Sequence, residues 1–330
     1  MIASTTISRL TLATATACAL APALAQGQAG AIPGLPNRAV QILIPNAAGG
    51  PADLLARVVG PKLSEAIGRS VIPDNRPSNN GIVAGELVSH GPADGTMLLV
   101  GNTGTQAINA TLYRGLQYSP VNDFAPITNA ITSGLYAVAN PKLPAESIKD
   151  LIAYAKKVPG KINLAIAGAT GQIAGNALKL QAGIDMNDVW YKGGTPAVIA
   201  VISGESMLTL TNLSNVEPHV KAGKLKLIGL TSAKRDPLMP NIPTFAENGL
   251  AGYDVSMWYG FFAPVKTPAP VIQAYHRELS KILNMPEMKN YFSGQGYDMI
   301  INTPEQFAEQ LKRDYERYRK IILDSNMPLQ

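Results

Sequence analysis

Short β-rich runs alternate with helical patterns along the chain, and the turns between them contain glycine. This alternation limits the fold more than any other sequence feature, because it is typical of α/β units in which helices flank a mostly parallel sheet. We expect strands over residues 39–45, 97–101, 135–140, 162–167, 225–230 and 297–302. We expect helices over residues 52–67, 104–112, 146–157, 172–182, 195–203, 269–284 and 304–324.

Residues 1–25 have the pattern of a secretory signal peptide. Arg9 precedes an apolar, alanine-rich run that ends in Ala23-Leu24-Ala25, a small-residue cleavage motif. We therefore expect cleavage after Ala25 and a mature protein outside the cytoplasm; the alternative is an N-terminal amphipathic helix that stays in the fold. No later segment approaches the run of about 18 apolar residues that a membrane span needs.

The single cysteine, Cys18, lies inside this leader. Cleavage would leave no cysteine, so we expect neither disulfides nor thiol chemistry in the mature protein. The alternative is a lipoprotein attachment at Cys18, although Ala15-Thr16-Ala17 lacks the leucine usual three residues upstream.

The mature chain of 305 residues has a formal charge of +4, because the leader contributes only Arg9 to the total of +5. This length fits two domains of ordinary size. The basic residues are scattered, apart from residues 312–320, where they alternate with acidic residues as on a solvated helix face. Nucleic-acid binding would need a basic stripe with interleaved aromatic side chains, and the sequence has none.

The sequence lacks the common catalytic motifs. His90, His219 and His276 are too far apart to form a local metal motif, and residues 203–207 lack the second glycine of a nucleophile elbow. Neither a phosphate loop nor the spaced-glycine dinucleotide fingerprint occurs. We therefore expect no enzyme activity, no cofactor and no metal; the alternative is a periplasmic hydrolase whose catalytic residues are distant in sequence.

Four glycine-bearing loops stand where a predicted strand ends and a helix begins, the edge at which open α/β sheets bind ligands. Glycine lets the backbone approach a ligand closely, and free amides at a helix start suit a carboxylate. One such loop is weak evidence, because these turns also occur for purely geometric reasons. Two pairs facing each other across a cleft would hold a carboxylate from both sides. The loops cover residues 45–53, 101–105, 168–172 and 192–196.

From residue 36 onward the chain carries LPNRAVQILIPNAAGGPADLLAR, DNRPSNNGIVAGELV, WYKGGTPA, WYGFFAP and TPEQF, in this order. In order and spacing these motifs resemble the substrate-binding proteins of tripartite tricarboxylate transporters, also called the Bordetella uptake gene family. The resemblance implies a type II-like, two-lobed periplasmic binding fold, with a mixed sheet in each lobe and the ligand in the interdomain cleft. We expect a discontinuous domain 1 over residues 36–136 and 257–330, and domain 2 over residues 137–256.

By position, the resemblance implies that amides and hydroxyls of both domains contact the ligand, with ordered waters bridging one carboxylate group to the first domain. The chain departs from the family where an aromatic residue and two prolines usually precede the glycine pair, because it has Asn46, Ala47 and Ala48 there. The departure leaves the ligand's identity open. The predicted ligand-binding residues are Asn46, Ala48, Gly49, Gly50, Ala52, Asp53, Thr103, Thr105, Ala169, Thr170, Gly171, Gln172, Lys192, Gly193 and Asn212.

Some of these residues have a second interpretation. Asp53 could accept a hydrogen bond from the ligand or a bound water, or it could serve the first turn of its helix, where a negative side chain contributes about 0.3–1 kcal/mol. Lys192 could pair with a carboxylate or remain solvated, and Pro61 should kink or end the first helix. We expect core and hinge packing, rather than a stacking box, from Trp190, Tyr191, Trp258, Tyr259, Phe261 and Phe262.

Together these observations predict a solute-binding protein that closes around a small di- or tricarboxylate or an aromatic acid. Selectivity would follow from the length and polarity of the cleft, because a buried donor left unpaired by a wrong ligand costs about 1–3 kcal/mol. We expect a monomer that delivers its ligand to the permease subunits of a tripartite tricarboxylate transporter. The alternative is a sensor component whose liganded form docks on a sensor kinase.

Overall fold

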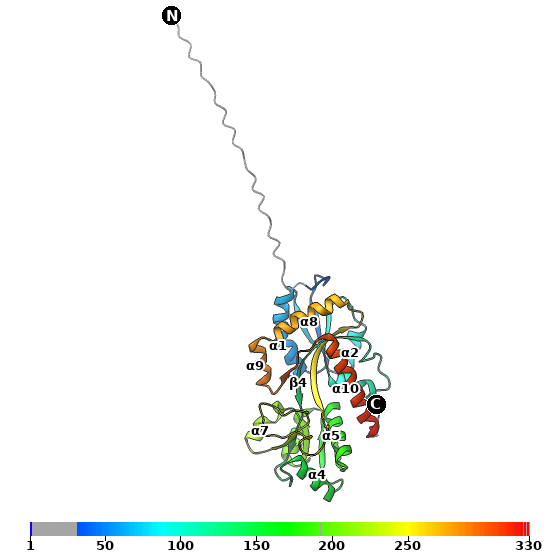
Figure 1. Ribbon diagram of the computed structural model, residues 1–330, viewed down its shortest axis with the longest axis vertical. Coiled ribbons are helices and arrows are strands. Elements are labelled where there is room, and N and C mark those ends of the chain that lie inside the picture. The colour runs from blue at the N-terminus through cyan, green and yellow to red at the C-terminus, as the bar shows by residue number, and fades with distance from the viewer. Residues whose placement is uncertain (2–31, 192, 326, 328, 330) are drawn as a thin grey trace.

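The computed structural model describes residues 1, 32–191, 193–325, 327 and 329. The predicted cleavage site, Cys18 and Lys192 lie outside the described residues. The chain forms two lobes stacked along its long axis, each built on one sheet flanked by helices (Figure 1).

The first lobe is built from strands and helices that precede Leu135 or follow Val255 in sequence, and it contains the longer sheet. Its strands are β1 (Val40–Ile44), β2 (Val71–Asn75), β3 (Met97–Asn102), β4 (Phe124–Gly134), β10 (Ser256–Pro264) and β11 (Asp298–Met299), in the order β11-β4-β10-β3-β1-β2. Its helices are α1 (Pro51–Ile67), α2 (Ile82–Ser89), α3 (Asn109–Leu112), α8 (Ala269–Leu283), α9 (Pro286–Ser293) and α10 (Pro304–Asp324), with helical turns η1 (Asn79–Gly81) and η2 (Gly104–Ile108).

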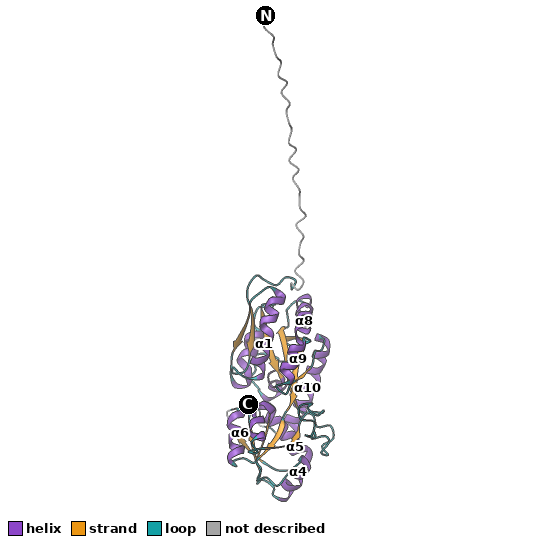
Figure 2. Cartoon of the chain, turned by 90° about the vertical axis from the view of Figure 1, so that its left-hand side faces the viewer, coloured by secondary structure: helices purple, strands orange, loops and turns teal. Residues whose placement is uncertain are grey.

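The second lobe is built from the middle of the chain. Its strands are β5 (Tyr136–Ala139), β6 (Asn163–Ile166), β7 (Asn187–Trp190), β8 (Leu208–Thr211) and β9 (Lys226–Leu230), in the order β7-β6-β8-β5-β9. Its helices are α4 (Ile148–Lys157), α5 (Gly168–Ala182), α6 (Gly194–Ser203) and α7 (Glu217–Lys221), with the turn η3 (Leu213–Asn215). Figure 2 shows α4, α5 and α6 around this smaller sheet.

The expected two-lobed fold of mixed sheets flanked by helices is confirmed. Parallel pairing joins β1 to β2 and β3 in the first lobe, and β6 to β7 and β8 in the second. The remaining pairs are antiparallel in the described residues, because β4, β5 and β10 run against their neighbours. The sheets are therefore less parallel than we expected from the sequence.

The expected helices and strands are present, with four local differences. The strand expected over residues 297–302 is reduced to Asp298–Met299 (β11), and α5 begins at Gly168, so the loop expected over residues 168–172 is the first turn of that helix. The chain over residues 104–112 forms a π-helical turn, η2, before the short α3. The first helix does not end at Pro61; α1 continues to Ile67, and Gly68 then ends it in the left-handed conformation (φ 63°). Glycine suits this position because it lacks the Cβ that penalises positive φ.

Alternating side chains of the first sheet enter different layers of the core. Val40, Ile42 and Ile44 of β1 pack with α1 and α8 on one face, whereas Leu43 joins the cluster that contains residues of α2 and α10 on the other. This alternation follows from the two-residue period of a strand. The cluster containing Leu43 continues into the second lobe through Leu164 and Leu208, so one apolar core connects the lobes.

The chain passes between the lobes at Leu135 and again at Val255, and Thr231 ties the two crossings together. The Thr231 hydroxyl accepts the Leu135 amide and donates to the Val255 carbonyl, both at 2.7 Å. Its own backbone N–H and C=O bond to the same two residues. We call β4 and β10, which lead into these crossings, the hinge strands.

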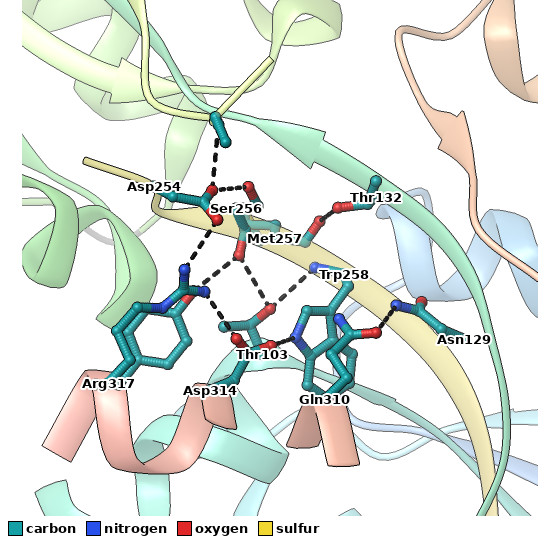
Figure 3. A network of polar contacts seen from close by, with 12 residues as sticks. Thr103, Asn129, Thr132, Asp254, Ser256, Met257, Trp258, Gln310, Asp314 and Arg317 are labelled. Carbon is teal, nitrogen blue, oxygen red and sulfur yellow. Dashed lines mark hydrogen bonds and ion pairs between the residues drawn. The ribbon is translucent and has the colours of Figure 1, made fainter. Parts of the chain in front are cut away.

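A partly buried polar network lies on the α10 side of the hinge strands (Figure 3). Asp314 of α10 accepts the Trp258 indole N–H at 2.8 Å and the Arg317 guanidinium at 2.7 Å. Arg317 also donates to Asp254 at 2.9 Å, immediately before β10. Because an unpaired charge in the interior is costly, these contacts stabilise α10 against the hinge only as a set.

We expect Asp314→Asn to lower the free energy of unfolding by about 2 kcal/mol, because it removes the charged acceptor that Trp258 and Arg317 share. Urea denaturation of the mature protein measures the change. Glu309→Gln is the control: its exposed carboxylate, on the same helix, contacts Arg313 only at 3.9 Å, so its loss should cost less than about 0.5 kcal/mol. Equal losses for the two variants would contradict the structural role of the network.

Candidate ligand-binding cleft

A cavity of about 220 Å³ lies between the two lobes. Residues from the ends of β1, β3, β6 and β8 meet there, in agreement with the rule that open α/β sheets bind ligands at the carboxyl ends of their strands. Every described residue that lines the cavity is uncharged. The lining residues are Asn46, Asn80, Asn102, Gly104, Thr105, Leu135, Ala167, Gly168, Ala169, Thr170, Gly171, Gly194, Leu210, Thr211, Asn212, Asn215, Met257 and Tyr259.

The start of α5 forms one wall of the cavity in the second lobe. Ala169, Thr170 and Gly171 line it, as predicted, and the N-cap residue Ala167 offers no side-chain cap to the first amides of the helix. Gly168 adopts φ 76°, a left-handed conformation that glycine tolerates best. Free amides at the start of a 15-residue helix are well suited to an anionic oxygen. The predicted Gln172 lies on α5 but does not line the cavity.

The segment after β8 completes the second-lobe wall with two asparagines. The side-chain amide of Asn212, a predicted residue, donates to the Ser133 hydroxyl at 3.0 Å and so reaches across to β4. Asn215 donates to the Thr211 hydroxyl at 3.0 Å. Sequence reasoning missed Asn215 and Thr211, because only the fold of η3 turns this segment toward the cavity.

The first-lobe wall is built from Asn46, Asn80, Asn102 and Thr105. Asn46 and Thr105 were predicted, whereas Asn102 lay in a recognised loop without being selected. Asn80 was missed, although the Asn80-Gly81 pair is a signal for left-handed backbone, and Asn80 has φ 46°. Its side chain donates to the Tyr113 hydroxyl at 2.8 Å.

Asp53 lies behind the loop between β1 and α1 and does not line the cavity. Its carboxylate accepts the Gly49 amide at 2.9 Å and the Arg57 guanidinium at 2.8 Å. Burial alone would raise the pKa of Asp53, but the bonds from Arg57, Gly49 and Asn75 and the charge of Arg57 hold the pKa below its usual range. The structure therefore supports the helix-and-loop interpretation of this residue.

Other predicted residues shape loops or the hinge rather than the cavity surface. Ala48, Gly49, Gly50 and Ala52 belong to the loop and first turn that Asp53 holds. Thr103 is buried and bonds with the hinge, since it accepts the Trp258 amide at 2.9 Å and donates to the Ser256 carbonyl at 3.3 Å. Gly193 precedes α6 at φ 112°, and the next residue, Gly194, lines the cavity instead.

The aromatic residues divide according to the face of β10 on which they lie. Tyr259 lines the cavity together with Met257, whereas Trp258 packs against Phe307 of α10. Phe261 and Phe262 are fully buried in the core. Burial raises the pKa of Tyr259 well above its usual range, with Tyr297 adding to the effect, so the Tyr259 hydroxyl is neutral.

Trp190 and Tyr191 lie away from the cavity. Trp190 is exposed, and the Tyr191 hydroxyl donates to Glu205 at 2.7 Å. Most of the aromatic set therefore packs in the core or lies on the surface, and Tyr259 is the member that reaches the cavity.

No group of His, Cys, Asp or Glu side chains within the described ranges is arranged to hold a metal ion. In the same part of the chain, no helix has the length and apolar character needed to cross a membrane.

A two-lobed α/β molecule with a polar cleft between its lobes has the architecture of a periplasmic solute-binding receptor. The family model described as tripartite tricarboxylate transporter family receptor matches residues 55–327. The chain therefore belongs to this family, in agreement with the resemblance noted in its sequence.

Relatives and solved structures agree with the family assignment. The chain is 30% identical over 309 residues to a UPF0065 protein from the tcbD-tcbE intergenic region of a Pseudomonas species, covering 93% of this chain and 92% of that protein. It is 28% identical to the protein BugT of Bordetella pertussis, covering 89% and 91%.

The Rpa4515 protein of R. palustris with adipate superposes with a TM-score of 0.80 at 29% identity, covering 88% of this chain and 98% of that one. The MatC protein of Rhodopseudomonas palustris with bound malate gives a TM-score of 0.76 at 26% identity, covering 87% and 100%. The family and these neighbours are solute-binding receptors.

We expect Asp53→Asn to lower the free energy of unfolding by about 1–2 kcal/mol at pH 7, because one carboxamide oxygen cannot replace both carboxylate oxygens. The folded-state pKa of Asp53 is depressed, so its contribution is present above the unfolded-state value of about 3.9 and is lost as the pH falls through the lower folded-state value. Urea denaturation at pH 7 and pH 3 should therefore show a smaller difference at pH 3.

Asp185→Asn is the control for this experiment, since Asp185 is exposed and its carboxylate has no hydrogen bond to the rest of the described chain. This variant should match the parent at both pH values. A pH-independent effect of Asp53→Asn would show that the ionised form of Asp53 is not what stabilises the loop.

Proposed function

We propose that this protein is a periplasmic receptor that captures a small carboxylate in the cleft between its lobes and delivers it to the permease of a tripartite tricarboxylate transporter. The observation that carries the proposal is the composition of the cleft: the amides and Thr170 hydroxyl at the start of α5 face a first-lobe wall of asparagine side chains. Both lobes therefore offer hydrogen-bond donors to one ligand.

The electrostatics of the cleft favour an anion. The helix macrodipole places partial positive charge at the start of α5, worth about 0.3–1 kcal/mol for a nearby negative group. Asp53, the acidic residue among the predicted ligand-binding residues, is paired with Arg57 and does not line the cavity, so it does not present an unpaired charge to the ligand. A carboxylate that enters the cavity therefore meets no negatively charged side chain among the described lining residues.

Closure of the two lobes provides the capture mechanism. In the part of the chain that the structure describes, the hinge strands meet the second lobe at Leu135 and Val255, and Thr231 joins these crossings. A ligand that bonds to both walls favours the closed arrangement by its differential affinity for that arrangement. The closed surface would then be recognised by the permease subunits.

Two comparisons support the ligand class and the compartment. The adipate and malate structures show two neighbours of this chain holding carboxylates. A further neighbour is described as the periplasmic binding protein BugD. We extend both properties to this chain, with export through the predicted signal peptide over residues 1–25 and no catalysis in the cleft.

We expect a carboxylate to raise the melting temperature of residues 26–330 by several degrees. Binding to the folded state alone adds about 2.7 kcal/mol at a ligand concentration one hundred times the Kd. Differential scanning fluorimetry against mono-, di-, tri- and aromatic carboxylates, with sugars, amino acids and phosphate esters as controls, tests the proposal. A shift confined to the control compounds, or none at all, would refute it.

In the same assay, Thr170→Val should weaken carboxylate binding roughly fivefold, because it removes one hydroxyl donor worth about 1 kcal/mol. Thr267→Val is the matched control. The Thr267 hydroxyl is also buried, has no partner among the described residues, and does not line the cleft. An equal effect of the two variants would mean that the Thr170 hydroxyl does not contact the ligand.

Ligand binding should also make the protein more compact in solution. We expect the radius of gyration, measured by small-angle X-ray scattering, to fall when the carboxylate that gives the largest thermal shift is added. A sugar that gives no shift is the control. An unchanged scattering profile at saturating ligand would argue against closure, even if binding itself were confirmed.

A further inference from the structure

The side-chain amide of Asn46 is held in one orientation by a chain of hydrogen bonds. The Thr105 backbone N–H, which can only donate, bonds to Asn102 Oδ1 at 3.0 Å. The Nδ2 group of Asn102 is therefore the one that donates to Asn46 Oδ1, at 3.1 Å. This polarity leaves the Asn46 Nδ2 group without a partner among the described residues, on a side chain that lines the cleft.

The backbone of Asn46 is held by a second chain of hydrogen bonds, in which the donor and acceptor of each bond are again fixed by chemistry. The Arg57 guanidinium, which has no acceptor, donates to Asn75 Oδ1 at 2.9 Å. Asn75 Nδ2 then donates to the Asn46 carbonyl at 3.1 Å. Asn46 is thus restrained at its carbonyl and at its side-chain oxygen, while its side-chain N–H group has no partner among the described residues.

We propose that Asn46 is a specificity-determining residue whose side-chain N–H group binds an oxygen atom at the first-lobe end of the ligand. The inference rests on the proposed function, in which the start of α5 binds a carboxylate from the opposite wall. A ligand that satisfies both walls carries oxygen at both ends, and the cavity of about 220 Å³ limits it to a short chain. The ligand therefore carries an acceptor oxygen at each end, and a short dicarboxylate, compared with a monocarboxylate that has an apolar tail, is the test case.

The discrimination follows from the asymmetry of hydrogen bonding. An apolar ligand would displace the water that bonds to the Asn46 N–H group and offer no acceptor in its place. The unpaired donor then costs more binding free energy than the hydrogen bond contributes for a ligand that does offer an acceptor. Asn46 thus acts against ligands with an apolar end as well as in favour of dicarboxylates.

Isothermal titration calorimetry with Asn46→Leu tests this role. Leucine has nearly the size of asparagine but no donor, so we expect succinate and adipate to bind at least tenfold more weakly. Butyrate and hexanoate, which have the same chain lengths but one carboxylate, should bind with unchanged or higher affinity. The readout is the ratio of the two affinities, which a general loss of folding would not change selectively. Asn241→Leu, an exposed asparagine outside the cleft, is the control and should leave the ratio unchanged.

The orientation of the amide can be tested separately with Asn102→Ala, which removes the donor to Asn46 Oδ1 without placing a charge in the cleft lining. The Asn46 amide is then free to turn, so we expect the preference for succinate over butyrate to fall. In the Asn46→Leu background the same change should leave that preference unaltered, because no amide remains to be oriented. An equal fall in both backgrounds would overturn the hydrogen-bond chain as the cause.

The results separate this inference from the proposed function. If the parent protein binds dicarboxylates and Asn46→Leu lowers the affinities for di- and monocarboxylates equally, the role of Asn46 is wrong while the receptor function stands. If the parent binds no carboxylate, both proposals fall. A selective loss of succinate and adipate, absent from Asn241→Leu, supports the assignment.

Discussion

The hydrogen bonds of Thr231 hold together the two places where the chain passes between its lobes. The Thr231 hydroxyl accepts from the Leu135 amide and donates to the Val255 carbonyl, and the backbone of Thr231 bonds to the same two residues. Because the crossings are joined, a movement of one lobe must bend both of them together. The relative position of the two cleft walls, and hence every contact that a ligand makes with both, depends on this buried junction.

The hinge strand β10 serves packing on one face and the cleft on the other. Met257 and Tyr259 line the cavity, while Trp258 between them bonds to Asp314 of α10. The two-residue period of a strand makes this division possible within three residues. The residue that β10 anchors to α10, Trp258, and the two residues that face the cavity are therefore adjacent in sequence, so a change at one should affect the other.

Charged side chains lie behind the cleft, whereas uncharged polar groups line it. Arg57 pairs with Asp53 and orients Asn75, and Asn75 in turn holds the backbone of Asn46. The ion pair thus determines the loop conformation without facing the ligand. Amides and hydroxyls in a preformed arrangement discriminate between ligands by donor and acceptor position, because a mismatched group is left unpaired.

The sequence by itself determined the α/β alternation, the family and the glycine-bearing segments at the carboxyl ends of β1, β3, β6 and β7, because periodicity and glycine turns are local properties. It also placed Asn46, Thr105 and Thr170 in the cleft. Only the tertiary structure decided that Asp53 serves its own loop, that Asn80 and Asn215 reach the cavity, and that Asn46 presents a donor. The asparagines depend on partners from other segments, such as Tyr113 for Asn80 and Asn102 for Asn46. Asp53 is held by Gly49 and Arg57 of its own loop and helix, and Arg57 in turn bonds to Asn75 of β2. A side chain's role follows from the hydrogen bonds it makes there, and the direction of a hydrogen bond cannot be derived from sequence spacing.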